Sequence, residues 1–228
     1  MDISKVFNLL SGGIGTSLKI FGLTLLFSIP LGMLVALGRM SKFKPLSWIL
    51  NIYILIMRGT PLMLQIIVVF FAIPLLQQDP PGFLKEFFEN YQIENMDRFT
   101  AIIVAFSINY AAYFAEIFRG GILSIPKGQY EAGACLGFTK IQTFFKIVLP
   151  QVVKRVLPAT SNEVITLVKD TSLAYVLGVS ELFLIAKQQT NFYSSMAPLF
   201  LAGLFYLIMC LFITVIFWFA EKRLNYYK

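Results

Sequence analysis

Residues 17–38 read SLKIFGLTLLFSIPLGMLVALG, and this stretch decides the class of fold. A helix needs about 20 mostly apolar residues to cross the hydrocarbon core of a bilayer. The stretch meets that length, and Lys19 is its one charged residue. The sequence therefore predicts a membrane-spanning helix at this place in the chain.

The composition of the whole chain agrees with this prediction. Of the 228 residues, 57% are hydrophobic and only 14% are charged, and the mean hydropathy is +0.75. So large an apolar share exceeds what one globular core can bury, and the surplus needs lipid. A soluble enzyme is a poor fit. We attribute the net charge of +7 to loops of a membrane protein, not to nucleic-acid binding.

Residue types that catalysis and metal binding use most are scarce. The chain has no histidine, which removes Ser-His-Asp, Cys-His and His-metal chemistry. Its two cysteines, Cys135 and Cys210, lie far apart in the sequence and indicate neither a disulfide framework nor a zinc site. We expect no catalytic residue, no metal site and no cofactor.

Further apolar segments extend the prediction to an all-α integral membrane protein with five transmembrane helices. The fourth segment is the weakest of them. The predicted spans cover residues 17–38, 46–76 with an interruption at Pro61, 99–118, 156–186 and 198–219.

Loop charges predict the orientation of these spans. The loop after the first span holds Arg39, Lys42 and Lys44 without an acid. The loop at 77–98 has five acidic and two basic residues, a net charge of −3, whereas the loop at 119–155 has six basic residues against Glu131. Because basic loops stay in the cytoplasm, the N-terminus is expected outside and the tail, 221–228, inside.

Two segments outside the spans also have helical patterns. Ile3, Val6, Phe7 and Leu10 fall on one helical face, which predicts an interfacial amphipathic helix over residues 1–15 on the outer leaflet. After the turn residues Pro80-Pro81-Gly82, the run FLKEFFENY at 83–91 predicts a second short amphipathic helix on the same side.

The cytoplasmic loop contains the most informative segment, QYEAGACLGFTKIQTFFKIVLP at 129–150. It is too polar to span. Helix-favouring residues around Glu131 and Leu136 are followed by Gly137, which can end a helix in the left-handed conformation. Thr139 can cap a second short helix. The pattern predicts a compact pair of helices at this face, and a plain amphipathic loop is the alternative.

Glu131-Ala132, Gly137 six positions later and then Ile147-x-Leu149-Pro150 resemble the EAA loop of permease subunits in ATP-binding-cassette importers. Three flanking runs strengthen the match: MRGTPLMLQ at 57–65, FRGGILSIPKGQYEA at 118–132 and VKDTSLAYVLGVSEL at 168–182. Together they resemble the polar amino acid uptake branch of type I importers, similar to histidine and glutamine permeases. One departure is Gly133, where the motif has a second alanine.

The resemblance implies a type I transmembrane domain over residues 16–220, in a bacterial cytoplasmic membrane. It implies that the loop forms coupling helices that sit on a separate ATPase, so the contacts fall to Glu131, Ala132, Leu136, Gly137 and Pro150. It also implies a second permease subunit, identical or related, and an external solute-binding protein. The chain itself lacks the GxxxxGK[ST] phosphate loop, so we expect a transporter subunit and not an enzyme.

The fourth span carries the first group of pathway candidates. An ionisable side chain at membrane depth is costly and points to function. Glu163, Thr166 and Asp170 share one face if the segment stays helical. Asn162 and Thr171 add neutral hydrogen-bonding groups. The alternative is that these side chains hold the fourth span against its neighbours.

The second and third spans supply Arg58, Gln65 and Asn109 as further candidates. Pro61 has no N–H, so carbonyls near Met57 and Arg58 need other partners, in protein or in a water-lined cavity. Arg58 can bind a carboxylate, but we favour a snorkelling arginine near the cytoplasmic end. Glu116 and Arg119 are expected to form a structural pair at the cytoplasmic boundary.

Two other functions compete with the importer permease. A stand-alone secondary transporter would show inverted repeats and paired broken helices, and the chain shows one break. A membrane scaffold would not need carboxylates within a span. For the solute, two carboxylates on one face favour a cationic amino acid, and a neutral polar one such as glutamine or cystine is the alternative.

Overall fold

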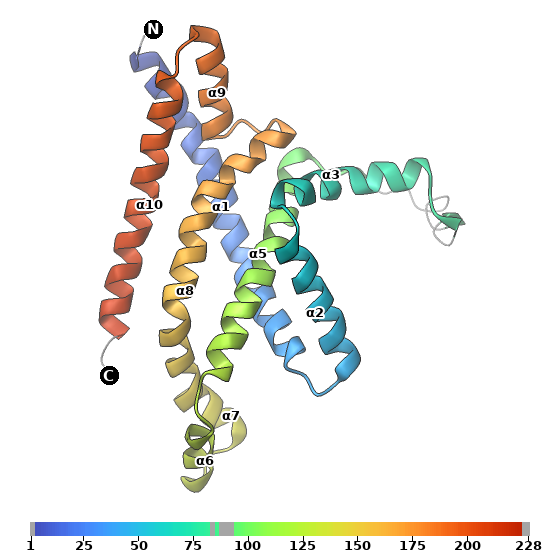
Figure 1. The fold of residues 1–228 in the computed structure, drawn as a ribbon, viewed down its shortest axis with the longest axis vertical. Helices are drawn as coiled ribbons and strands as arrows, with labels where there is room; N and C mark the ends of the chain where they lie inside the picture. The colour runs from blue at the N-terminus through green and yellow to red at the C-terminus, as the bar shows by residue number, and fades with distance from the viewer. Residues whose placement is uncertain (1–2, 83–84, 87–93, 225–228) are drawn as a thin grey trace.

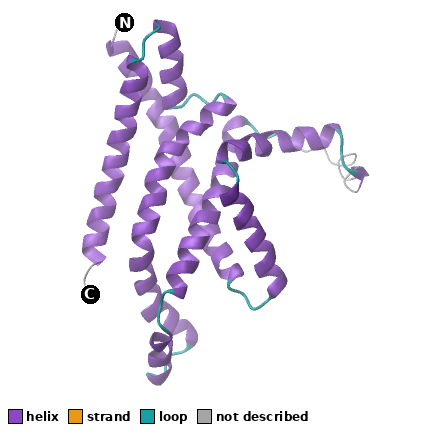
Figure 2. Ribbon diagram, viewed as in Figure 1, coloured by secondary structure: helices purple, strands orange, loops and turns teal. Residues whose placement is uncertain are grey.

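The computed structural model describes residues 3–82, 85–86 and 94–224, and the regular structure in these residues is helical (Figure 2). The expectation of an all-α chain is confirmed for this part. The helices are α1 (Ile3–Arg39), α2 (Lys44–Gly59), α3 (Leu62–Gln78), α5 (Arg98–Leu123), α6 (Lys127–Cys135), α7 (Lys140–Thr143), a π-helical turn η2 (Phe144–Val148), α8 (Leu149–Asp170), a 3₁₀ helix η3 (Thr171–Leu177), α9 (Leu182–Tyr193) and α10 (Ala197–Leu224).

Helix α5 is the central element of the bundle, and α1, α2, α3 and α8 all contact it (Figure 1). Asp97 caps its first turn by accepting from the backbone N–H groups of Phe99 and Thr100. Phe106, Tyr110 and Phe114 lie one helical turn apart and are almost completely buried. Because α5 is enclosed by other helices, its polar side chains meet protein instead of lipid.

Helix α1 corrects the prediction for residues 1–15. It runs without a break from Ile3 to Arg39, so no separate interfacial helix precedes the first span, and the expected boundary at residue 16 falls within it. Val6 and Leu10 are buried with Leu182 of α9 and Ala202 of α10. Val6 and Leu10 of the predicted face thus pack against protein, whereas the prediction placed the face on lipid.

The second predicted span is also corrected. Residues 46–76 form two helices, α2 and α3, which bend by 114° at the break before Pro61. Helix α3 points away from the rest of the bundle (Figure 1). Pro61 fixes an extended conformation before α3 and has no N–H to continue α2, so the chain turns here.

The predicted fourth span, 156–186, is not one helix either. It comprises most of α8, then η3, a turn at Gly178 and the start of α9. Among the described residues, α1, α5 and α10 are long and apolar enough to cross a membrane, and the bent α2–α3 pair counts as a fourth at most. The number of crossings therefore stays a prediction.

The two ends of the molecule differ in character. Helices α6 and α7 form a knob beyond one end of the bundle, and the C-terminal end of α10 points the same way (Figure 1). The N-terminus and α9 lie at the opposite end. The amphipathic helix predicted over 83–91 lies outside the described residues, apart from residues 85 and 86.

Candidate functional site

The break between α2 and α3 collects two of the predicted pathway residues. The Met57 carbonyl would meet the N–H of the fourth following residue, and that residue is Pro61. Instead it accepts from the Asn109 amide of α5 at 2.9 Å and from the Gln65 amide at 3.0 Å. Asn109 also donates to the Gln65 carbonyl oxygen at 2.9 Å. The freed carbonyl was expected to find a partner in protein or in a water-lined cavity, and the structure shows the first of these.

Arg58 lies just before this break. It is 14 residues beyond Lys44, about 21 Å along α2 from the end that joins α1. That end lies toward α6 and α7 (Figure 1), yet the Arg58 guanidinium is still near enough to Arg39, at the end of α1, for the two charges to interact, so the snorkelling role stays a prediction. The Arg58 guanidinium carbon lies 5.3 Å from the centre of the Tyr113 ring, a cation–π contact.

Helix α8 presents the two predicted carboxylates toward α5. The helix continues through Asp170, so Glu163, Thr166 and Asp170 do share one face. Asp170 Oδ2 accepts a hydrogen bond from the buried Tyr110 hydroxyl at 2.7 Å. Glu163 is half-buried, and Arg58 is near enough for the two charges to interact. The structure thus brings α2, α5 and α8 together around opposite charges.

The neutral candidates on α8 and η3 are less available to bind a solute. The Thr166 hydroxyl donates to the Asn162 carbonyl at 3.0 Å, and the buried Thr171 hydroxyl donates to the Val168 carbonyl at 2.7 Å. Asn162 and Lys169 are exposed. The two threonine hydroxyls therefore satisfy their own backbone, and the charged groups remain the stronger candidates.

One buried carboxylate, outside α8, was not predicted from the sequence as a candidate. Glu181 is fully buried and caps α9 by accepting from the backbone N–H groups of Phe183 and Leu184, each at 2.7 Å. It also accepts from the Tyr206 hydroxyl of α10 at 2.9 Å. The signal was present, because Glu181 is an acid inside the segment predicted as the fourth span, and the rule that selected Glu163 applies to it equally.

The predicted pair of helices in the loop at 129–150 is present. Gly137 has a φ of +74° and ends α6, with its N–H donating to the Ala134 carbonyl and the next N–H donating to the Gly133 carbonyl. This is the hydrogen-bond pattern of a Schellman motif. Thr139 then forms a capping box with Gln142 at the start of α7. Both local predictions, at Gly137 and at Thr139, are confirmed.

The knob of α6 and α7 exposes apolar side chains. Leu136 is 70% exposed and Ile141 71% exposed, and Glu131, Ala132 and Pro150 also lie on the surface. Large exposed apolar side chains beyond the end of a bundle indicate a surface that another protein covers.

Helical structure continues from this knob to the carboxylates. From Lys140 the chain runs through α7, η2 and α8 to Asp170 without a non-helical residue. The N–H of Leu149 donates to the Phe144 carbonyl, five residues back, directly before Pro150. Because Pro150 cannot donate to the carbonyl four residues earlier, the wider π turn keeps the run helical.

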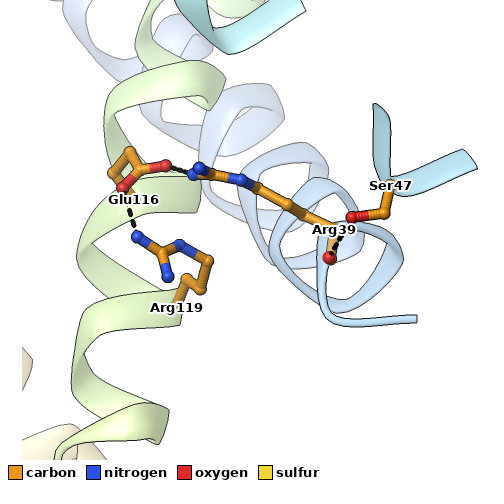
Figure 3. A network of polar contacts seen from close by, with 4 residues as sticks. All are labelled: Arg39, Ser47, Glu116 and Arg119. Atoms are coloured by element: carbon orange, nitrogen blue, oxygen red, sulfur yellow. Dashed lines mark hydrogen bonds and ion pairs between the residues drawn. The ribbon is translucent and has the colours of Figure 1, made fainter. Parts of the chain in front are cut away.

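A network of polar contacts joins α1, α2 and α5 (Figure 3). Glu116 of α5 pairs with Arg119 at 2.9 Å, which confirms the predicted pair, and it also pairs with Arg39 at the end of α1. The Ser47 hydroxyl of α2 donates to the Arg39 carbonyl at 2.7 Å. The ends of α1, α2 and α5 are thus tied to one another.

Comparison with known proteins agrees with this architecture. Residues 28–226 match the family described as the binding-protein-dependent transport system inner membrane component. The chain is 36% identical to the L-cystine transport system permease protein TcyB of Bacillus subtilis, covering 96% of this chain and 88% of the relative. It is also 36% identical to the arginine transport system permease protein ArtQ of the same organism, covering 93% and 91%.

A solved structure is similar over nearly the whole chain. It is the crystal structure of an amino acid ABC transporter with histidines, with a TM-score of 0.81 and 30% identity over 97% of this chain and 96% of that one. The arrangement of helices in Figure 1 is therefore the type I importer permease fold.

Proposed function

The chain belongs to the family of inner membrane components of binding-protein-dependent transport systems, so it is a permease subunit of an ATP-binding-cassette importer, and we propose that it carries polar amino acids along the charged face of α8. A stand-alone secondary transporter does not fit this family. The proposed crossings are α1, α2, α5, α8 and α10, with the N-terminus outside and the knob of α6 and α7 in the cytoplasm of a bacterial cell.

The observation that carries the pathway proposal is geometric: α5 has Asp170 of α8 on its Tyr110 hydroxyl and Arg58 of α2 on its Tyr113 ring, three residues further on. Free amino acids are zwitterions. Glu163 and Asp170 suit the ammonium group, and Arg58 suits the carboxylate. Asn109 and Gln65 keep the bent backbone beside Arg58 in place through the Met57 carbonyl. In this proposal they position the site and do not bind the solute.

The charge balance favours a cationic side chain on the solute. Two carboxylates and one guanidinium leave one negative charge, and Lys169 is exposed on another face. The relatives named above carry cystine or arginine by their names, so a neutral polar solute is the competing outcome.

The test is Glu163→Gln in the assembled transporter, with Lys169→Gln as the matched control. Removing one carboxylate at a half-buried site is expected to lower uptake of arginine or lysine at least about tenfold, while protein level and basal ATPase activity hold. Unchanged uptake of arginine or lysine would refute the proposed cation site. Loss of folded protein would show that Glu163 holds helices together.

Arg58→Gln gives an independent readout. If Arg58 binds the solute carboxylate, the KM rises for every amino acid carried, whatever its side chain. A change confined to one side-chain class would contradict that role.

Coupling to the ATPase is proposed to run through the knob. Its exposed residues Glu131, Ala132, Leu136, Gly137 and Pro150 supply the contact surface for the ATPase subunit. The continuous helical run from Lys140 to Asp170 then carries displacement of the knob to the carboxylates. A solute-binding protein, as the family's description implies, delivers the solute on the opposite side.

A second permease subunit, identical or related, completes the proposal. Helix α3 extends away from the bundle with Leu64, Val68, Phe71 and Leu75 exposed (Figure 1). A two-fold partner would cover this apolar helix and enclose the pathway. Mass measurement of a purified, transport-competent complex tests this, and a complex with one permease copy would refute it.

A further inference from the structure

A basic groove lies at the turn between α1 and α2, on the side of the bundle toward the knob. Its volume is about 650 Å³, and it is lined by side chains from three helices. The residues that matter for the argument are Arg39, Lys44, Ser47, Trp48, Asn51 and Arg119.

The groove has a positive charge that its own ion pairs do not cancel. Arg39 and Arg119 share one carboxylate, that of Glu116 (Figure 3). Lys44 adds a third cation, so three positive charges face one negative charge, a net of +2. No acidic residue lines the groove among the residues described. Its charge therefore complements an anion.

Two exposed tryptophans indicate the depth of this groove in the membrane. The chain has two tryptophans, and Trp48, at the rim of the groove, is 67% exposed. The other, Trp218 near the end of α10, is 53% exposed and has the Lys222 ammonium 5.1 Å from its ring. Both helix ends point toward the knob (Figure 1). Exposed tryptophan beside lysine is typical of the membrane–water interface.

We propose that this groove binds the phosphate head group of an anionic phospholipid. Lys44 and the two arginines face the phosphate, while the acyl chains lie along the exposed apolar side of α2, which includes Ile49 and Leu55. A soluble anion would use the charge but leave that apolar side uncovered. Anionic lipids are attracted by such juxtamembrane basic residues. The inference rests on the proposed orientation only for the choice of leaflet.

A lipid bound in this groove would contact the end of α5 that leads into the knob. Arg119 lies near the end of α5, and the chain passes from α5 into α6 within a few residues. Binding at Arg39, Lys44 and Arg119 would hold the ends of α1, α2 and α5 together beside the knob.

The experiment uses the full-length chain in phosphatidylcholine vesicles. Trp218→Phe leaves Trp48 as the one tryptophan. Phosphatidylglycerol and phosphatidylcholine with brominated acyl chains are compared as quenchers of Trp48 fluorescence. Phosphatidylglycerol is expected to quench at lower mole fraction. Lys44→Gln is expected to reduce that preference about fivefold, the effect of one basic residue near a membrane surface.

Lys42→Gln is the matched control, because Lys42 is exposed in the same turn but does not line the groove. It should leave the preference unchanged. Equal quenching by the two lipids would overturn the proposal, as would an equal loss in Lys42→Gln. Abolition of the preference by millimolar inorganic phosphate would show a site for a soluble anion and also overturn it. Solute uptake does not enter this test, so it stands apart from the test of the pathway.

Discussion

The Asn109 side chain on α5 donates a hydrogen bond of 2.9 Å to the Met57 carbonyl on α2, which Pro61 leaves without its helical partner. The carbonyl that the helix break leaves free thus accepts a hydrogen bond from a residue of another helix, 52 positions away in the chain. Asn109 is 3% exposed, so water does not replace this donor.

Asn109→Ala should therefore destabilise the protein. Gln65 still donates to Met57, but its own carbonyl loses the Asn109 donor, and a cavity remains on α5. The expected loss is about 1–3 kcal/mol in the free energy of unfolding, measured on purified protein in detergent. Asn8→Ala, an exposed asparagine of α1, is the control and should be neutral. Unchanged stability with lost uptake would instead place Asn109 in contact with the solute.

Local motifs were predictable from the sequence, and long-range partners were not. The left-handed Gly137 and the cap at Thr139 depend on neighbouring residues, so short patterns were sufficient. The freed Met57 carbonyl was predicted in the same way, but its partner Asn109 was not, because a pattern around Pro61 carries no information about α5.

The errors have a common physical cause. The helical face of Val6 and Leu10 has the same pattern whether lipid or protein covers it, so α1 was divided wrongly. Residues 46–76 were likewise taken as one span, because both halves of the segment are apolar. A bend of 114° changes the height of everything that follows α2, and hydropathy alone does not give its angle.

Gly133 explains the departure from the second alanine of the EAA motif. A Cβ at this position would lie 2.6 Å from both Cγ2 and Oγ1 of Thr143, so α6 and α7 approach too closely for alanine. Gly133→Ala is expected to push the two helices apart and to reduce solute-stimulated ATPase activity severalfold. Thr143→Ala removes both of those atoms, so the double variant should recover most of the activity. A double variant as impaired as Gly133→Ala would contradict this packing argument.

Gly137 should not tolerate replacement by a residue with a side chain, for a different reason. A Cβ there has open space, but its φ of +74° disfavours residues with a side chain. The strain is about 1–2 kcal/mol. Gly137→Val should leave the permease in the membrane, weaken ATPase docking and abolish uptake, as measured by co-purification and transport assays. Gly128→Val, also in open space but in the ordinary helical conformation of α6, is the control. Normal uptake by Gly137→Val would refute the coupling role of the knob.

Glu181 should be the most sensitive carboxylate for stability. Its side chain accepts from the N–H groups of Phe183 and Leu184 and from the Tyr206 hydroxyl, and it is fully buried. Glu181→Ala leaves all three donors without their acceptor, so the expected loss is about 3 kcal/mol or more in the free energy of unfolding. Tyr206→Phe removes the hydroxyl that donates to Glu181 and should cost about 1–2 kcal/mol. Hydrogen exchange should rise in α9 for Glu181→Ala first, because the cap belongs to that helix. If Tyr206→Phe costs as much as Glu181→Ala and exchange in α9 is unchanged, the carboxylate anchors Tyr206 and does not maintain α9.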